Sequence, residues 1–416
     1  MKIDSSIYSG RCACGREHSM VTRAAIIESG CLKDFEKYMT EYGIAGKRCA
    51  IYGQNTYKAT ADRHPFAEQE IVLNSEGLHA NEISTAEVLA KLEDDVQVLI
   101  AVGSGTIHDI TRFCAYQRGI RFVSCPTAAT VDGFCSTVAA MTWYGYKKTM
   151  TAVAPEIVVA DVDIIANAPM ELVRSGVGDI MAKYTALADW RISALLTGEY
   201  FCPTIHDITK KAADSVMESV PGIIRGEVEA YANVTYALIM SGIAMQMIGN
   251  SRPASGCEHH VSHMIECGPA AFTVRFPAMH GEKTGVGTVI AAGEYHRLAA
   301  IEDITPYLTD YAPVSDEDYR AFFGGELAEA VIEENRADCL AAVTRERLAE
   351  CWSGIRAIVA EIPGEDYFFG LLQQLGAKRT LEDIGVSSDD LAVLLDKSPL
   401  IRNRLTLMRV RRMIRH

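Results

Sequence analysis

An apolar run that ends at a glycine turn most constrains the fold of this chain. The run, Val96-Gln-Val-Leu-Ile-Ala-Val102, has the length and composition of a buried strand, and Gly103-Ser-Gly-Thr follows it directly. A helical pattern then extends from Thr106 to Tyr116. Because a strand, a tight turn and a helix in this order belong to βαβ units, this segment predicts a parallel sheet.

The same alternation extends over the first part of the chain. Short apolar runs separated by helix-length segments predict further strands at Arg48–Tyr52, Glu70–Leu73, Arg121–Ser124 and Ile157–Ala160. We therefore predict an N-terminal α/β domain over residues 1–166, Rossmann-like and suited to binding a nucleotide.

Strand signals become scarce after Asn167. Apolar residues recur at three- and four-residue steps, which is typical of amphipathic helices. These helical stretches cover residues 169–196, 206–218, 225–248, 284–301, 328–361 and 388–412. The sequence thus predicts an all-α C-terminal domain over residues 167–416. Its basic end, Arg402 to Arg415, is predicted to dock as a helix with apolar residues inward and arginines in water, in preference to binding RNA or a membrane.

Length and charge limit the class of protein. A chain of 416 residues suggests two or three domains. With 54 acidic against 40 basic residues, the net charge of −14 argues against a general nucleic-acid binder or a protein of anionic membranes. We find no run of 18 apolar residues and no secretory signal in residues 1–10, so we expect a soluble cytoplasmic enzyme or binding protein whose scattered cysteines are reduced core thiols.

One local cysteine cluster stands apart from the others. Cys12-Ala-Cys14-Gly-Arg-Glu-His18 has the residue types of half a zinc site. However, a second cysteine pair is missing, and one intervening residue is tighter than the usual two to four. We favour a turn or hairpin without metal at this position.

Two neighbouring loops are candidates for binding a nucleotide. Gly103 and Gly105 let the backbone approach a ligand, and the helix start at Thr106 favours a pyrophosphate, although the third glycine of the dinucleotide fingerprint is absent and a plain turn is an equal alternative. The second loop, 125–136, follows the next strand and should lie beside the first. Its Thr127, Thr130 and Ser136 can bond to a ribose, a phosphate or an amide, and its Asp132 to a substrate hydroxyl, although each alone is more often a turn residue.

Histidine is sparse but clustered. Of eleven histidines, three fall at 259, 260 and 263, and His280 opens the next helical segment. Asp179 ends Gly176-Val-Gly-Asp near another helix start. Two imidazoles and a carboxylate from separate helices can bind a divalent metal and leave a coordination position open, whereas a helix cap and surface histidines are the alternative.

These segments together resemble a known family. GSGT with Asp109, PTAATVDGFCS at 126–136, GVGD at 176–179, SRPASGCEHHVSH at 251–263 and HGEKTGVG at 280–287 occur in the order found in sn-glycerol-1-phosphate dehydrogenases of the bacterial form. That family belongs to the superfamily of iron-containing alcohol dehydrogenase, glycerol dehydrogenase and dehydroquinate synthase. The resemblance implies a dehydroquinate synthase-like fold, with an active site in a cleft between the α/β and helical domains.

The resemblance also implies roles for individual residues. The ligands of one divalent metal (zinc, nickel or iron) would be Asp179, His259 and His280, with Asp179 also counted among the catalytic residues. His263 would contact the substrate or relay a proton, and Asp132 would contact the substrate. His260 leaves the ligand ambiguous by one position, but only His259 shares a helix face with His263. NAD or NADP would be held by Asn55, Gly103, Ser104, Gly105, Thr106, Ile107, Thr127, Ala128, Ala129, Thr130 and Ser136, and Lys147 or Lys148 would face the nicotinamide or the phosphate.

The implied reaction is the reversible NAD(P)H-dependent reduction of dihydroxyacetone phosphate to sn-glycerol 1-phosphate by a homodimer. Arg252 and Lys283 are candidates for the substrate phosphate, although a solvated surface charge is slightly favoured for each. Three alternatives stay open: a dehydrogenase of glycerol or another polyol (phosphate), a dehydroquinate synthase-like lyase that regenerates its NAD, and a nucleotide- and metal-binding sensor. The intact set of Asp179, His259, His263 and His280 argues against the sensor.

Overall fold

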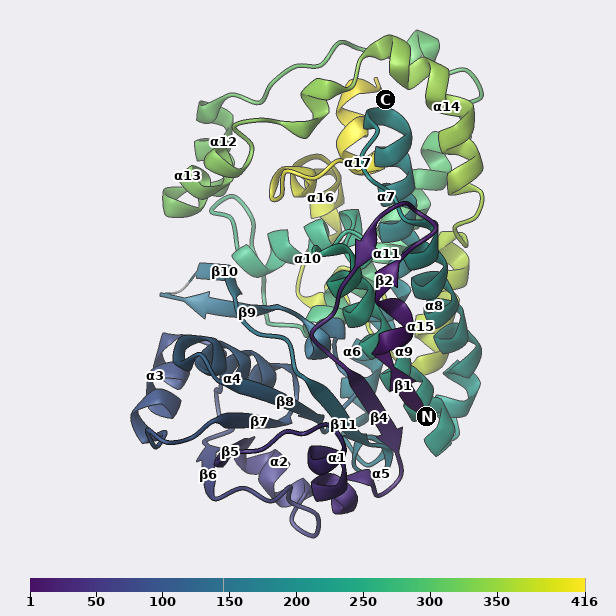
Figure 1. Ribbon diagram of the computed structural model, residues 1–416. Coiled ribbons are helices and arrows are strands. Elements are labelled where there is room, and N and C mark those ends of the chain that lie inside the picture. The colour runs from purple at the N-terminus through teal and green to yellow at the C-terminus, as the bar shows by residue number, and fades with distance from the viewer. Residues whose placement is uncertain (145, 416) are drawn as a thin grey trace. The chain divides into compact units, whose positions relative to one another are not determined.

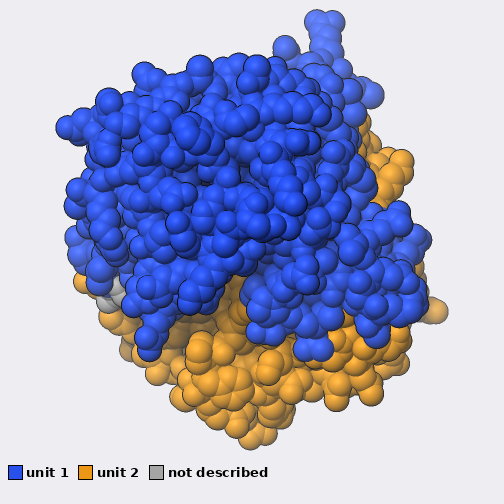
Figure 2. All heavy atoms as spheres, turned by 90° about the horizontal axis from the view of Figure 1, so that it is seen from below, with its two compact units in different colours: residues 1–180, 214–250 blue, residues 181–213, 251–416 orange. Residues whose placement is uncertain are grey.

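The chain divides into two compact units in the computed structural model, which describes residues 1–144 and 146–415 and only the backbone at 146 and 147. One unit comprises residues 1–180 and 214–250, and the other comprises residues 181–213 and 251–416 (Figure 2). The side chain of Lys147 therefore falls outside the described residues, while Lys148 is exposed.

The first unit is built on a seven-stranded sheet with the strand order β1-β4-β11-β8-β7-β5-β6. Only the pairing of β1 with β4 is antiparallel, and the other neighbours are parallel. The strands are β1 (Lys2–Asp4), β4 (Ala24–Glu28), β5 (Arg48–Gly53), β6 (Gln69–Leu73), β7 (Val98–Gly103), β8 (Arg121–Pro126) and β11 (Ile157–Asp161). The parallel α/β architecture predicted from the sequence is confirmed.

Helices cover both faces of this sheet because its strands are apolar on both sides. Along β7, Leu99 and Ala101 pack on one face with helices α3 (Glu82–Lys91) and α4 (Gly105–Arg118), and Ile100 and Val102 pack on the other with α1 (Phe35–Glu41). Figure 1 shows α3 and α4 together beside the strands. The remaining elements wholly within this unit are α2 (Gln54–Ala59), α5 (Val162–Ala166), α9 (Val228–Ile248) and the hairpin strands β2 (Gly10–Arg11), β3 (Glu17–His18), β9 (Val138–Trp143) and β10 (Tyr146–Thr151).

The second unit is helical. It contains α7 (Lys183–Thr197), α10 (Cys257–Cys267), α11 (His280–Ala299), α12 (Asp316–Phe323), α13 (Gly325–Glu334), α14 (Arg345–Val359), α15 (Glu365–Leu375), α16 (Leu391–Lys397) and α17 (Leu407–Val410). Two helices, α6 (Met170–Met181) and α8 (Pro203–Ile224), carry the chain from one unit to the other. None of the described helices is long and apolar enough to cross a membrane.

Most predicted elements are present, but two long helices are not. The stretch 328–361 is interrupted between α13 and α14, where Asp338 and Thr344 cap separate helical segments. The stretch 388–412 contains only α16, α17 and single turns. The apolar residues of the basic end 402–415 are buried as predicted. Arg409 is buried as well and bonds to Asn335 and Asp338, so the expectation that the arginines reach water is wrong for this residue.

The compact units do not follow the single boundary at 166/167. Helix α9 belongs to the first unit because it packs on β4, α5 and the short turn η3 (Asp132–Cys135). Gly242 permits this contact, since a Cβ atom there would lie 2.8 Å from the Cβ of Cys135. The division into an α/β domain at residues 1–166 and a helical domain at residues 167–416 is based on the type of secondary structure, and it stays a prediction.

A buried arginine ties α4 to the loop after β8. Arg112 donates hydrogen bonds to the carbonyl oxygens of Phe134 (3.2 Å), Ser136 (2.8 Å) and Val138 (3.3 Å). It therefore fixes the path of the segment that leads from η3 into β9.

We predict that Arg112→Met lowers the free energy of unfolding by about 3 kcal/mol, because buried carbonyl groups lose their donors. Urea unfolding of the purified protein measures this change. Arg118→Met is the matched control on the same helix, and it should cost less than about 1 kcal/mol because its partner Asp94 is exposed. Equal losses of unfolding free energy in the two variants would contradict a stabilising role for the hydrogen bonds of Arg112.

Candidate cofactor cavity and histidine cluster

A cavity of about 610 Å³ lies at the carboxyl edge of the parallel sheet. Gly53 at the end of β5, Ser104 after β7 and Thr127 after β8 all line it. The arrangement follows from topology, because parallel neighbours end at the same edge and their loops converge there. A cavity at this position is the expected place for a nucleotide in an open α/β sheet.

The turn after β7 brings backbone close to the cavity. A Cβ atom on Gly103 would lie 2.7 Å from the Cβ of Ile107, and one on Gly105 would lie 3.0 Å from Val131. Gly103 is therefore required for packing, and a side chain at Gly105 would need Val131 to shift. Helix α4 starts at Gly105, so its first backbone N–H groups and its dipole favour an anion at this turn.

The predicted cofactor residues fall into two groups. Those lining the cavity are Asn55, Ser104, Thr106, Ile107, Thr127 and Ala128. Those that do not line it are Gly103, Gly105, Ala129, Thr130 and Ser136. Ala129 instead packs under α6, where a Cβ on Gly176 would lie 2.2 Å from its carbonyl oxygen. The Ser136 hydroxyl accepts a bond from the backbone of Val138.

Several lining residues were missed by the sequence analysis. They are Gly53, Thr56, Ala59, Arg63, Ser75, Leu78, Asp163, Ile164, Asn167, Ala168, Pro169 and Leu172. Ser75 could have been found because it follows β6, at the same edge as the other loops. The segment after β11 offered no polar motif to identify it.

The predicted substrate contact Asp132 lies in a network with Asp179. The backbone N–H of Asp132 donates to Oδ2 of Asp179 (2.9 Å), and the hydroxyl of Ser241 donates to Oδ2 of Asp132 (2.8 Å). Asp179 itself is fully buried in the last turn of α6. A carboxylate buried in this way can serve as a ligand for a cation, since buried charges are favourable when paired or bound to a metal.

The second unit gathers three predicted histidines. His259 and His263 project from α10, and His280 is the first residue of α11. The ring centroid of His280 lies 5.2 Å from that of His259 and 5.9 Å from that of His263. We call these three residues the histidine cluster.

Two glutamates orient the histidine cluster. Oε1 of Glu258 accepts a bond from Nδ1 of His259 (2.7 Å), and Oε1 of Glu266 accepts one from Nδ1 of His280 (3.0 Å). Because Nδ1 carries the proton in each bond, the lone pair lies on Nε2. Carboxylates behind Nδ1 are the usual outer partners of metal-binding histidines.

The pKa values of His263 and Glu266, which lie beside each other, are both shifted from their usual range. Burial lowers the pKa of His263 to about 4, against the opposing effect of Glu266, so its imidazole is neutral near pH 7. Burial alone would raise the pKa of Glu266, but His280, His263 and Lys283 together hold it well below its usual range. His263 thus presents a neutral imidazole beside the ionised carboxylate of Glu266.

The other candidates near the cluster have different surroundings. His260 is buried, and burial together with Arg404 lowers its pKa well below the usual value. Arg252 donates to Glu199 and to the carbonyl oxygen of Leu405, and Lys283 forms an ion pair with Glu266 (2.8 Å). Both cations are buried, so neither is the solvated surface charge that the sequence favoured.

Comparison with known proteins identifies the class of protein to which this chain is similar. Residues 26–169 match the family model described as iron-containing alcohol dehydrogenase. A solved iron-containing alcohol dehydrogenase from Corynebacterium glutamicum shares the fold, with a TM-score of 0.63, 15% identity and 96% of each chain covered. The α/β unit, the helical unit and their motifs thus define the iron-containing alcohol dehydrogenase class, with a dehydroquinate synthase-like fold.

Curated relatives narrow the class to one family. A protein named glycerol-1-phosphate dehydrogenase [NAD(P)+] from Geobacillus stearothermophilus is 34% identical over 79% of this chain and 75% of its own length. One of the same name from Pyrococcus horikoshii is 34% identical over 65% of this chain and 78% of its own. The chain belongs to the glycerol-1-phosphate dehydrogenase family.

We predict that Glu258→Gln weakens metal binding about 10- to 100-fold, because the carboxylate that holds His259 is lost. The measurement is the metal concentration that restores half of the turnover of metal-stripped protein. Glu294→Gln is the matched control: this buried glutamate of α11 pairs with Arg297 and Arg411 instead of a histidine, and its loss should leave the value unchanged. An unchanged value for Glu258→Gln would remove this orienting role.

Proposed function

We propose that this protein reduces dihydroxyacetone phosphate to sn-glycerol 1-phosphate with NAD(P)H, and catalyses the reverse reaction. The histidine cluster carries the proposal, since its imidazoles have carboxylates behind Nδ1 in a chain whose relatives are named glycerol-1-phosphate dehydrogenases. A cytoplasmic location and a homodimer stay predictions from the sequence.

We propose Asp179, His259 and His280 as the ligands of one divalent metal. Two imidazole nitrogens and a carboxylate oxygen suit zinc, nickel and iron alike. The burial of its carboxylate supports Asp179 as a ligand. The hydrogen bonds that Glu258 and Glu266 accept support His259 and His280, respectively. These residues would hold the ion so that it supplies Lewis-acid polarisation of the substrate oxygen, and bound NAD(P)H would supply the hydride.

The sheet edge is proposed to bind the dinucleotide. The N–H groups at the start of α4 would hold the pyrophosphate, and Ser104 and Thr106 line the cavity beside them. Asn55, in the first turn of helix α2 after β5, would contact the adenosine side. Gly103 and Gly105 contribute because they have no side chains, which would contact Ile107 and Val131 and push the turn out of its present path.

Residues around the reacting oxygen are proposed to position the substrate and move a proton. Asp132 is held by Ser241 and would accept a bond from a substrate hydroxyl. His263 would relay a proton from solvent to the oxygen in reduction and from the oxygen to solvent in oxidation. Oε2 of Glu266 lies 3.4 Å from its Nδ1 and holds the ring in place. We do not assign the substrate phosphate to Arg252 or Lys283, because both already pair with glutamates.

We predict that metal-stripped protein loses NAD(P)H oxidation with dihydroxyacetone phosphate, and that one added metal restores it. Asp179→Asn, His259→Ala and His280→Ala should each lower kcat/KM by at least about 1,000-fold, because Lewis-acid stabilisation contributes several kcal/mol. Circular dichroism should show an unchanged fold.

Three controls separate this activity from the alternatives. His64→Ala removes a histidine whose ring bonds to a carbonyl on the sheet unit, and it should leave the activity intact. Glycerol in place of the phosphorylated substrate tests a polyol dehydrogenase, and an absence of net NAD(P)H change during turnover would indicate a lyase. Wild-type activity in any ligand variant would remove that residue from the set, and binding without turnover of any substrate would indicate the sensor.

We predict that Asn55→Ala raises KM for NAD(P)H about 3- to 10-fold with little change in kcat, because one hydrogen bond to the cofactor is lost in both ground and transition states. Steady-state kinetics at saturating dihydroxyacetone phosphate measure both constants. Lys58→Ala, at an exposed position on the same helix, should leave KM unchanged. A drop in kcat alone for Asn55→Ala would contradict this contact.

A further inference from the structure

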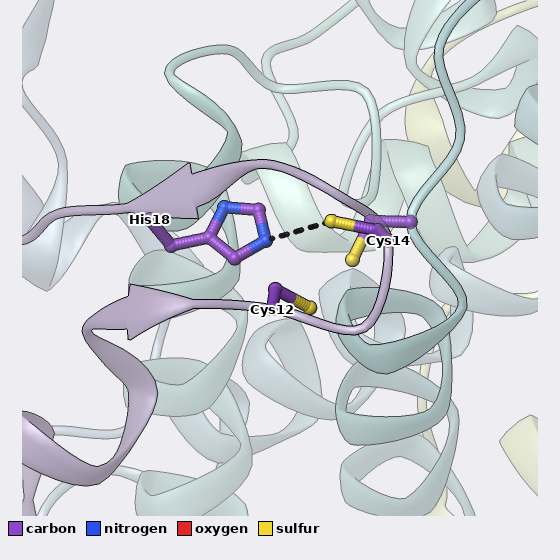
Figure 3. A group of neighbouring side chains, drawn as sticks. Cys12, Cys14 and His18 are labelled. Atoms are coloured by element: carbon purple, nitrogen blue, oxygen red, sulfur yellow. Dashed lines mark hydrogen bonds between the residues drawn. The ribbon is translucent and has the colours of Figure 1, made fainter.

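A small hairpin near the N-terminus brings two cysteines and a histidine together. Strands β2 and β3 pair with Gly10 opposite His18, and the loop between them contains Cys12 and Cys14. The backbone N–H of Cys12 donates to the carbonyl of Arg16 (2.9 Å), which closes the loop. Figure 3 shows the three side chains turned toward one another within this loop.

The distances suit a shared metal ion. Sγ of Cys14 lies 3.5 Å from Nε2 of His18, and Sγ of Cys12 belongs to the same group of ligand atoms, which all lie within 4.8 Å of one another. Tetrahedral zinc with Zn–S of about 2.3 Å and Zn–N of about 2.0 Å would place a sulfur and a nitrogen about 3.5 Å apart. The pair therefore already has the separation that zinc requires.

His18 is held with its metal-binding nitrogen toward the sulfur atoms. Its Nδ1 donates to the carbonyl oxygen of Met247 (2.7 Å) in the last turn of α9. The proton is therefore on Nδ1, and Nε2 carries the lone pair that faces Cys14. A backbone carbonyl behind Nδ1 is a common outer partner of a metal-binding histidine.

The hairpin needs such a link, because it has almost no apolar core of its own. None of residues 6–17 is buried, and each of its strands is two residues long. Two-stranded hairpins are marginal in water even when longer, and small elements of this kind are often held by a metal.

We propose that Cys12, Cys14 and His18 bind a structural zinc ion that fastens this hairpin. The thiolates and the imidazole supply three ligands, and binding releases the thiol protons to solvent. A water or a further side chain completes the tetrahedron. The catalytic metal proposed above has only imidazole and carboxylate ligands, so the two sites differ in chemistry and can fail separately.

Cobalt substitution distinguishes the two sites, because only thiolate ligands give a sulfur-to-cobalt charge-transfer band in the near ultraviolet. Purified full-length protein, stripped of metal under reducing conditions and titrated with Co²⁺, should show this band with an end point of about one ion per chain. Cys12→Ser and Cys14→Ser should lose the band. His259→Ala, which alters the proposed catalytic site, should retain it.

Two further variants keep the test independent of folding. Cys339→Ser is the matched control, since Cys339 is a partly buried cysteine outside the hairpin, and it should keep the band. His18→Cys should keep and strengthen the band by adding a third thiolate, whereas a hairpin held only by hydrogen bonds would gain none.

Thermal unfolding supplies a second readout. Chelation should lower the Tm of His259→Ala, which lacks a ligand of the proposed catalytic metal, by several degrees, and should leave the Tm of the double variant His259→Ala, Cys14→Ser unchanged. Absence of the charge-transfer band from the wild-type protein would overturn the proposal. A band as strong in Cys12→Ser and Cys14→Ser as in the wild-type protein would also overturn it.

Discussion

The parallel pairing of β5, β7, β8 and β11 is the constraint on which the first unit depends. The loops that follow parallel strands all leave the sheet at its carboxyl edge, so segments distant in sequence line a single cavity there. A sheet of this kind is apolar on both faces, so helices must cover both of them. The cofactor cavity therefore follows from hydrophobic burial as much as from any polar residue.

Carboxylates play a comparable part in the helical unit. Glu266 bonds to His263 and His280 and pairs with Lys283, while Glu258 accepts from Thr185 as well as from His259. These acids stay charged in buried surroundings because cationic or donor groups surround them. Glu258 precedes His259 directly in sequence and Glu266 follows His263 by one helical turn, whereas the bond from His280 to Glu266 joins α11 to α10.

Much of this arrangement could be predicted from local sequence. The strand at β7, the turn at Gly103 and the spacing of His259 and His263 are local signals, and local periodicity identified them. Other features depend on packing between distant segments. Nothing near Ser241 or Met247 indicates that α9 contacts Asp132 and His18, and the buried Arg409 looks in sequence like any surface arginine.

Between the last strand of the sheet, β11, and helix α9 lie the 66 residues 162–227. This helix contacts β4, α5 and η3, and the carbonyl of its Met247 receives the bond from His18. During synthesis on a ribosome, the sheet unit is consequently incomplete until residue 250 has left the exit tunnel. The apolar surface awaiting α9 is exposed during that interval, which makes the nascent chain a natural client for a chaperone at this stage.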